Sequence, residues 1–581
     1  MPRKRRAPIF GLHFARAFGR LIRIYWASPD ARIGALLYAG AAALELGTVY
    51  ANVRLSDAER NIFDALELKE SGAFFAATGL FLTVALAFVL VSTFRIYIRQ
   101  ALEIRWRRAV TGHYLERWIN GHAYIQAELH RGELDNPDQR VQEDIRDFVA
   151  SALGLSLSLL SAVATLVSFG GLLWVLSGHF PLRADGLELR IPGLLLWVAI
   201  GYAVLSTWIT HLVGRPLVPI NFERLKVEAD FRYGLTRFRD HVETVALSHG
   251  EAVERLGLLE RFSHVVGNWW QLIRAQRNLM LLTTGIGQTN SLVPLLVAAP
   301  AYFAGHLTLG SMTQIRFAYG QVSGALTWFV NAYQEIARWR ASIERLRTFA
   351  EVMDQTSREI ERGKIHVEAG ASPALRLAGL HVEEPDGCPV LEVADATLAT
   401  GDRVALVGPS GCGKTMLIRA IGGIWPFGEG RIEVPAGARM MFFPERPYFP
   451  LGSLRAAVSF PAATGSFPDE QIRETLELLG LGHLSARLDE VEPWEQVLSP
   501  HEQQRLALAR AFVHRPDWLF LDKATTALDE DMEKRVYALL EERLPRATIV
   551  SVAHRPEIAD YHARRWTFVP GRDGHVLLQA A

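Results

Sequence analysis

The sequence contains few cysteines and has no surplus of either charge. Cys388 and Cys412 are its only two cysteines among 581 residues, which excludes a disulfide framework. Lys+Arg and Asp+Glu both number 62, so the formal net charge is zero. Bulk binding to nucleic acid needs a basic surplus, and we expect no nucleic-acid partner. Only 21% of the residues are charged and 49% are hydrophobic, which excludes a disordered chain.

The N-terminal region has no pattern of a cleavable signal. The basic residues at positions 3–6 precede no compact apolar run with a small-residue cleavage site. Segment 9–26 is amphipathic, with Arg16, Arg20 and Arg23 on its polar side. Two interpretations remain open, a soluble surface helix or a helix lying in the cytoplasmic membrane interface. Residues 1–30 are therefore expected to form an interfacial N-terminal helix region.

Long apolar stretches are confined to the part of the chain before residue 350. A membrane-spanning helix needs about 20 mostly apolar residues. Six stretches approach this length: 33–51, 73–94, 150–177, 191–213, 279–305 and 311–333. They predict a six-helix transmembrane domain over residues 31–350, embedded in a lipid bilayer.

Lysine and arginine in the connecting segments indicate the orientation in the membrane. Segments 95–148 and 214–278 are rich in arginine, whereas the loops on the other side carry few basic residues. Since basic loops stay in the cytoplasm, both termini are predicted to be cytoplasmic. Both arginine-rich segments exceed 50 residues and have helical patterns, so the spanning helices should extend into the cytoplasm as long helical extensions.

Glu45 is an ionisable residue inside the first apolar stretch. A charge at membrane depth is costly and is a candidate for function. The alternatives are that Glu45 pairs with a nearby basic group or that it lies close enough to the interface to remain hydrated.

A phosphate-binding loop follows a predicted buried strand at 402–407. The residues Gly408, Pro409, Ser410, Gly411, Cys412, Gly413, Lys414 and Thr415 match G-x-x-x-x-G-K-[ST] between a strand and a helix. Glycines let backbone N–H groups close around phosphate oxygens. Lys414 would neutralise the β- and γ-phosphates of ATP, and Thr415 would bind Mg²⁺.

Further nucleotide-site motifs follow in order along the chain. The strand 518–521 ends in Asp522, a carboxylate placed to hold Mg²⁺. Between these motifs lies the segment 498–505, with Ser499, His501 and Glu502. Downstream lie Asp529 and, after a strand at 547–553, His554.

This ordered set resembles the ATPase domain of ABC transporters. The resemblance implies a Q-loop at Glu445, a signature motif at 498–502 that acts in trans, a D-loop at 526–529 and a switch histidine at 554. In the family two such domains pair head to tail around ATP. One chain carries one set of motifs, so the resemblance implies a homodimer.

The membrane half is similar to the SbmA/BacA-like group, which is related to subfamily D, the peroxisomal fatty-acyl transporters. The similarity rests on segments 50–66, 135–145, 228–251 and 296–310, and on Trp494–Val497 before LSPHEQQR. It implies an exporter-type fold with coupling helices at 136–147 and 240–251. Bacterial members of the group handle peptides and peptide-like compounds in the inner membrane.

Four positions depart from the ABC pattern. Lys523 occupies the place of the glutamate that polarises the attacking water, and a protonated lysine cannot act as a base. Glu445 replaces the Q-loop glutamine, His501 replaces a signature glycine, and segment 381–387 has no aromatic residue to stack on adenine. Three of these departures lie near the γ-phosphate and predict slow hydrolysis. Lys523 and Glu445 could pair.

The sequence therefore predicts a multidomain protein, with a six-helix α-helical transmembrane domain followed by an α/β P-loop ATPase domain. Residues 351–374 are expected to be a linker and residues 375–581 the nucleotide-binding domain, with ATP and Mg²⁺ as cofactors. The expected function is ATP-dependent transport of peptides or other bulky hydrophilic compounds. The alternatives are an ATP-gated protein with little hydrolysis, a proton-coupled transporter that uses Glu45, and a lipid or acyl-CoA transporter.

Overall fold

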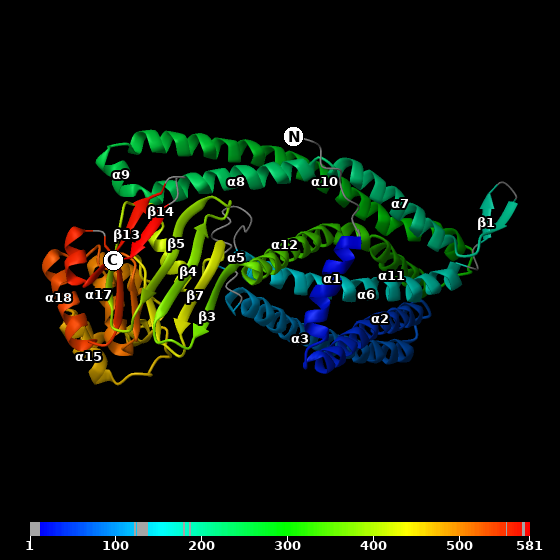
Figure 1. Cartoon of the computed structure of the whole chain (residues 1–581). Coiled ribbons are helices and arrows are strands. Elements are labelled where there is room, and N and C mark those ends of the chain that lie inside the picture. The colour runs from blue at the N-terminus through cyan, green and yellow to red at the C-terminus, as the bar shows by residue number, and fades with distance from the viewer. Residues whose placement is uncertain are drawn as a thin grey trace. The chain divides into compact units, whose positions relative to one another are not determined.

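A computed structural model describes residues 12–120, 124, 137–177, 181–184, 187–553, 555–571 and 576–580. The chain divides into two compact units (Figure 1). The first unit is formed by Met1–Leu115 and Asn136–Thr348, and the second by Glu116–Asp135 and Phe349–Ala581.

The first unit is almost entirely helical. Its elements are α1 (Leu12–Trp26), α2 (Ala31–Glu67), α3 (Ser71–Asn120), α5 (Pro137–Gln139), the π-helix η1 (Arg140–Asp144), α6 (Ile145–Ser177), α7 (Leu194–Gly214), α8 (Leu217–Asp240), α9 (Val242–Leu247), α10 (Glu251–Phe303), α11 (Leu309–Leu326) and α12 (Trp328–Arg362). A small hairpin, β1 (Pro181–Ala184) and β2 (Leu187–Arg190), lies between α6 and α7. Both α3 and α12 continue past the boundary between the units.

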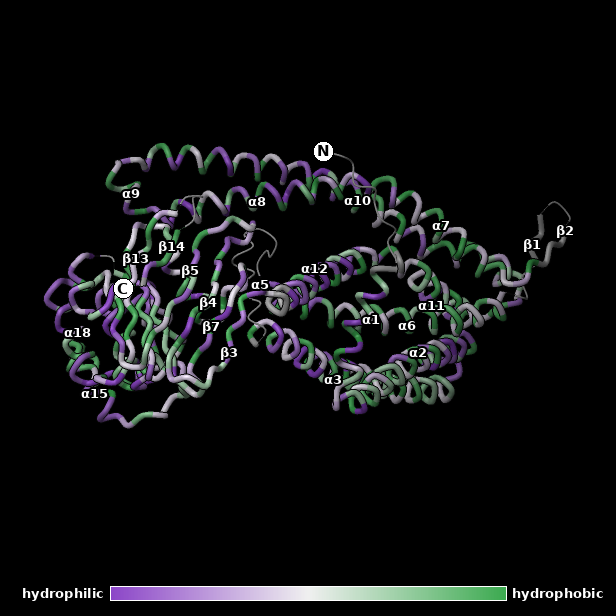
Figure 2. Tube along the Cα trace, viewed as in Figure 1, coloured by the Kyte–Doolittle hydropathy of each residue, from purple (hydrophilic) through white to green (hydrophobic). Residues whose placement is uncertain are grey.

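Four helical segments of the described chain are long and apolar enough to cross a membrane. They are Ala31–Glu67, Ser71–Ile119, Pro137–Ser177 and Leu194–Asp240. Figure 2 shows mostly hydrophobic residues along α7 and more hydrophilic residues along α8. The remaining predicted spans, 279–305 and 311–333, are also largely helical but are not among these four segments. The count of six membrane crossings stays a prediction.

Helix lengths explain how spanning helices extend beyond the bilayer. The 37 residues of α2 rise over about 55 Å at 1.5 Å per residue, whereas the hydrocarbon core is about 30 Å thick. The 50 residues of α3 form a still longer rod. Helix α3 thus continues past the apolar stretch 73–94 into segment 95–148, while the cytoplasmic location of the extensions stays a prediction.

Helix α1 packs through one face against the helices that follow it. Ala17, Leu21 and Tyr25 are buried, and the ring of Tyr25 stacks on Trp106 of α3 with centroids 5.6 Å apart. On the opposite side, Arg16 and other arginines remain exposed. The described part of segment 9–26 is therefore an amphipathic helix packed on the first unit.

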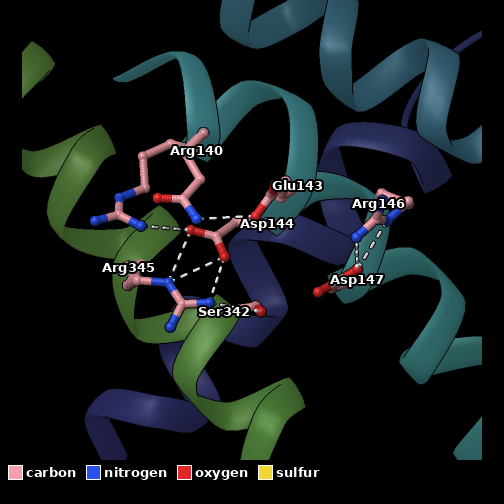
Figure 3. Close-up of polar contacts among 8 residues, drawn as sticks. Arg140, Glu143, Asp144, Arg146, Asp147, Ser342 and Arg345 are labelled. Carbon is pink, nitrogen blue, oxygen red and sulfur yellow. Dashed lines mark hydrogen bonds and ion pairs between the residues drawn. The ribbon is translucent and has the colours of Figure 1, made fainter. Parts of the chain in front are cut away.

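The start of α6 is fixed by a buried carboxylate. Figure 3 shows Asp144, at the end of η1, facing Arg345 of α12 and Arg140. The Nε atom of Arg345 donates to both carboxylate oxygens of Asp144 at 3.0 and 2.8 Å. Nη1 of Arg140 donates to Oδ2 at 3.1 Å. The side chain of Asp144 is only 3% exposed, so these bonds compensate for its desolvation. This contact ties the segment expected as the first coupling helix to α12.

The second unit is built around a ten-stranded sheet with strand order β3-β7-β4-β5-β14-β13-β6-β12-β11-β8. The strands are β3 (Lys364–Gly370), β4 (Leu375–Glu383), β5 (Pro389–Leu398), β6 (Arg403–Val407), β7 (Gly428–Pro435), β8 (Met440–Phe443), β11 (Trp518–Leu521), β12 (Thr548–Val552), β13 (Arg564–Pro570) and β14 (Val576–Ala580). The strands predicted over 402–407, 518–521 and 547–553 are confirmed as β6, β11 and β12.

Helices and short strands complete the second unit. They are α13 (Lys414–Ile421), β9 (Gly452–Ser453), α14 (Leu454–Ser459), α15 (Asp469–Leu478), η2 (Gly482–Arg487), β10 (Val491–Glu492), α16 (Trp494–Val497), α17 (Pro500–His514), α18 (Glu530–Arg543) and η3 (Pro556–Tyr561). Strands β8, β11, β12, β6 and β13 are parallel to their neighbours in this part of the sheet. All four residues of β11 are buried, as expected for a parallel strand covered on both faces.

The expectation of a linker at 351–374 is wrong for most of that segment. Helix α12 continues to Arg362, and Lys364–Gly370 form β3, which pairs in parallel with β7. Buried and exposed residues do not alternate clearly along this strand, because most of its side chains are exposed. An edge strand with little buried surface has no clear hydrophobic pattern in the sequence.

Candidate nucleotide-binding site

The phosphate-binding loop runs from the end of the buried strand β6 to the start of α13. Gly411 and Gly413 have φ angles of 81° and 87°, in a region that favours glycine. Gly408 has no room for a side chain, because a Cβ there would lie 2.7 Å from Cβ of Phe568. These glycines give the loop a tight turn with a backbone that a ligand can approach closely. Pro409 and Ser410 lie on its exposed rim.

Lys414 is a buried cation that points back into this loop. It is 7% exposed, and its Nζ donates to the carbonyl oxygens of Gly408 and Pro409 at 2.7 and 2.6 Å. The Sγ atom of Cys412 lies 3.3 Å from the same nitrogen. Within the described residues Lys414 has no carboxylate partner. A buried ammonium without an acid, next to a glycine loop and a helix N-terminus, fits a polyphosphate group.

Thr415 and Asp522 form the candidate magnesium position. The Oγ1 atom of Thr415 donates to Oδ1 of Asp522 at 3.1 Å. Burial raises the pKa of the Asp522 carboxyl, against the opposing effects of the Thr415 hydrogen bond and of Lys523. A hydroxyl and a carboxylate oxygen are the hard ligands that Mg²⁺ prefers. The pair would hold Mg²⁺ together with phosphate oxygens and water.

Lys523 lies directly after Asp522 and faces Glu445. Its Nζ is 3.8 Å from Oε2 of Glu445, and both side chains are partly exposed, at 37% and 57%. Lys523 has a φ angle of 54°, which is unusual for a residue other than glycine. The pairing considered from the sequence is present, and it brings a cation to the place of the family's glutamate.

Gln504 is a residue that the sequence analysis missed. It is 4% exposed, and its Nε2 donates to the Glu445 carbonyl oxygen and to Oγ1 of Thr526, both at 3.1 Å. The backbone N–H of Ala527 donates to its Oε1 at 2.8 Å. Gln504 thus joins α17, the Q-loop position and the D-loop. The adjacent glutamines of the signature helix were visible in the sequence, but the direction of their side chains was not.

The signature segment begins helix α17. Ser499 caps this helix, and its Oγ donates to Oε2 of Glu502 at 2.7 Å. This hydrogen bond lowers the pKa of Glu502. Nε2 of His483 lies 3.1 Å from Oε1 of Glu502, while His501 is exposed. His501 is therefore accessible next to the N-terminus of α17.

Two further predicted site residues, Asp529 and Glu45, have contacts of their own. Asp529 caps α18, because its Oδ1 accepts a hydrogen bond from the N–H of Met532 at 2.8 Å. His554 falls outside the described residues. In the first unit, Glu45 is 7% exposed, and its Oε2 accepts a hydrogen bond from Arg95 at 2.8 Å. Glu45 therefore has the basic partner that was one of the interpretations left open by the sequence.

The helical first unit and the nucleotide site of the second unit define a membrane protein that binds ATP. A family model described as ABC transporter transmembrane region 2 matches residues 21–303, and one described as ABC transporter matches residues 391–526. The chain belongs to the ABC transporter family, as a half-transporter with one membrane region and one ATP-binding domain.

Two curated relatives support this assignment over nearly the whole chain. The inner membrane ABC transporter ATP-binding protein YddA of Escherichia coli is 31% identical, over 93% of this chain and 94% of YddA. ABC transporter D family member 2 of Arabidopsis thaliana, described as chloroplastic, is 29% identical, over 94% of this chain and 85% of the relative. The expected relation to subfamily D is confirmed.

A solved structure of a bacterial Atm1-family ABC exporter with ATP bound has the same fold. The TM-score is 0.64 at 17% identity, and the match covers 94% of this chain and 95% of the exporter. The predicted exporter-type fold, a helical membrane domain followed by an α/β nucleotide-binding domain, is confirmed.

Proposed function

We propose that the protein is an ATP-dependent transporter that moves peptides or other bulky hydrophilic compounds and hydrolyses ATP slowly. It acts as a homodimer in a bacterial inner membrane, with both termini in the cytoplasm. The observation that carries the proposal is Lys523, which stands after the magnesium-site aspartate and faces Glu445 at 3.8 Å.

The proposed homodimer follows from the number of nucleotide-site motifs in one chain. One chain has one phosphate loop and one signature segment, and the exporter fold to which it is similar typically dimerises. A complete nucleotide site then combines the loop 408–415 of one subunit with Ser499, His501 and Glu502 of the other. Two identical subunits form two identical sites, so an intact site does not compensate for an altered one.

The residues of the loop have separate tasks toward Mg²⁺-ATP. The ammonium of Lys414 neutralises phosphate charge, and the N–H groups of the glycine loop donate to phosphate oxygens. Thr415 and Asp522 hold Mg²⁺, with Glu445 as a further acidic group near it. Mg²⁺ supplies charge neutralisation between the phosphates when it is bound.

The chemical step lacks its usual base. General-base assistance contributes about 10²–10⁴ in rate, and the ammonium of Lys523 cannot accept the proton of the attacking water. Glu445 is occupied by the ion pair with Lys523 and brings negative charge toward the γ-phosphate. ATP affinity is therefore retained while turnover is low.

The test measures affinity and turnover on the same sample. Full-length protein is reconstituted in lipid nanodiscs, and ATP binding and phosphate release are measured with Mg²⁺. The proposal expects saturable ATP binding with turnover at least about 100-fold below that of a relative with glutamate at this position. Normal turnover would contradict slow hydrolysis, and loss of ATP binding would contradict the role of the phosphate loop.

A second function is favoured by the same three altered positions. Lys523, Glu445 and His501 all depart from the family pattern near the γ-phosphate, so ATP binding alone could switch the membrane domain. Transport supported by a non-hydrolysable ATP analogue through many cycles distinguishes this ATP-gated protein from a transporter that consumes ATP.

A further inference from the structure

The first unit contains a cavity with an unusual set of charges. Its volume is about 420 Å³, within the range of small-molecule sites. Glu45, Arg95 and Arg99 are its charged lining residues. Glu45 lies within the apolar stretch 33–51 of α2, whereas Arg95 and Arg99 of α3 follow the apolar stretch 73–94. A charge at membrane depth, such as that of Glu45, is costly and marks a substrate or ion pathway.

The two arginines differ in their partners. Arg95 is paired with Glu45, with 2.8 Å between Nη1 and Oε2. Arg99 is partly buried, and it makes no hydrogen bond or ion pair within the described residues. The charged lining therefore carries one positive charge that no lining carboxylate neutralises.

One acid approaches Arg99 from outside the lining. Oε1 of Glu335 lies 3.1 Å, and Nη2 of Arg99 lies 3.3 Å, from the point that a Cβ of Gly154 would occupy. Glu335 and Arg99 nevertheless form no ion pair. The absence of a side chain at Gly154 lets both groups approach its backbone closely, and the charge of Glu335 reduces the attraction of Arg99 for an anion.

The remaining lining combines small or polar residues with apolar ones such as Ile96, Leu157 and Trp328. Gly320 and Gly324 of α11 line the cavity, and a Cβ added at either position would meet no atom within 4 Å. The hydroxyl of Ser158 accepts a hydrogen bond from the indole Nε1 of Trp328 at 3.1 Å. Such walls accommodate the polar backbone of a ligand and leave room for side chains.

We propose that this cavity binds the carboxylate of a peptide-like substrate and that Arg99 is the residue that holds it. A guanidinium can bind a carboxylate through two parallel hydrogen bonds, and Arg99 has these donors available. The inference deepens the proposed transport function and rests on it for the class of ligand.

The test compares two probes that differ only in charge. N-acetyl-trialanine has a free carboxylate and no ammonium, and N-acetyl-trialanine amide is its neutral counterpart. Binding of both to the full-length protein in nanodiscs is measured by calorimetry without ATP. We expect the free acid to bind about tenfold more tightly than the amide.

Two charge variants should change this preference in opposite directions. Arg99→Gln should abolish the preference for the acid, whereas Glu335→Gln should increase it because a repelling charge is removed. Arg108→Gln, on the exposed part of the same helix, is the control and should leave the preference unchanged. A cationic ligand site would reverse both effects.

A steric variant tests the place of binding independently of charge. A Cβ at Gly324 meets no atom within 4 Å, so Gly324→Val adds bulk to the cavity lining and should weaken both probes, whereas the exposed Gly79→Val should weaken neither. Equal affinity of acid and amide, or no measurable binding of either, overturns the proposal. Since ATP is absent, failure of ATP-driven transport would leave this binding result unaffected.

Discussion

The Nζ atom of Lys523 lies 3.8 Å from Oε2 of Glu445. In the proposed site this pair takes the positions of the family's catalytic glutamate and Q-loop glutamine. The family pair of glutamate and glutamine has a summed charge of −1. The pair of Lys523 and Glu445 has a summed charge of zero, so the charge at these two positions changes by one unit. Rate effects at this position should therefore depend on charge as well as on the presence of a base.

Restoring the carboxylate should raise turnover. Lys523→Glu supplies a group that can polarise water, and it should increase phosphate release about tenfold or more. Because Glu445 would then repel the new carboxylate, the double variant Lys523→Glu/Glu445→Gln should be faster still. Lys523→Gln is the matched control, since it removes the cation without adding a base. An equal increase in Lys523→Gln would show that the positive charge of Lys523, and not the lack of a base, limits the rate.

Asp522→Asn should stabilise the protein in the absence of nucleotide at neutral pH. Burial raises the pKa of Asp522 above its usual 3.8, so the ionised form is disfavoured in the folded state. That cost is present above the raised pKa and fades as the pH falls toward the unfolded value. The gain in melting temperature should therefore shrink between pH 7 and acidic pH. Calorimetric scans across pH check this trend.

The same variant should impair magnesium binding. Asparagine keeps the acceptor for Thr415 but removes the charge, so the Mg²⁺ dependence of ATP binding should weaken. Binding of ATP measured at increasing Mg²⁺ concentration is the readout. A pH-independent gain in stability, or unchanged Mg²⁺ dependence, would contradict the role assigned to Asp522.

Asp144→Asn should destabilise the first unit. Arg345 and Arg140 both bind the buried carboxylate, and removal of one member of a buried ion pair costs about 3–5 kcal/mol. The side chain of Arg345 is 42% accessible, so water can solvate its charge in the variant. The loss of unfolding free energy should therefore lie at the lower end of this range. Chemical denaturation of the reconstituted protein measures it. Asp147→Asn, which removes an exposed partner of Arg146, should have little effect.

Gln504→Leu should weaken the connection between the Q-loop and the D-loop. The substitution leaves the Glu445 carbonyl oxygen and the Ala527 N–H without their partner, at a cost of about 1–3 kcal/mol for each buried group. We expect a lower melting temperature and lower ATPase activity. Gln496→Leu, at an exposed position, serves as the control. Restoration by Gln504→Glu is not expected, because a carboxylate cannot donate to the Glu445 carbonyl oxygen.

The phosphate loop could be predicted from the sequence because its function depends on local geometry. The residues between β6 and α13 need positive φ angles and a close backbone approach, and glycine at fixed spacing satisfies both. In the same way, the four apolar residues of β11 before Asp522 indicate a buried strand with a carboxylate at its end. Such features are encoded within a few neighbouring residues.

Contacts between distant residues could not be predicted in the same way. Gln504 meets Glu445 across 59 residues, and Arg345 meets Asp144 across 201 residues. Each side chain alone resembles an ordinary polar residue on a helix. The pairing of Glu45 with a basic residue was only one interpretation among several, and the sequence did not identify Arg95 because it does not show the register in which α2 packs on α3.

The strand β3 restricts how the nucleotide-binding unit can be isolated. It lies at the end of the sheet and covers β7, and only Gly363 separates it from α12. A fragment that began at residue 375 would lose this strand and leave the hydrogen-bonding groups of β7 open to pairing with another chain. Open sheet edges promote aggregation. A soluble form of the ATPase should therefore begin at or before Lys364, and insolubility of a shorter fragment would reflect its unprotected edge.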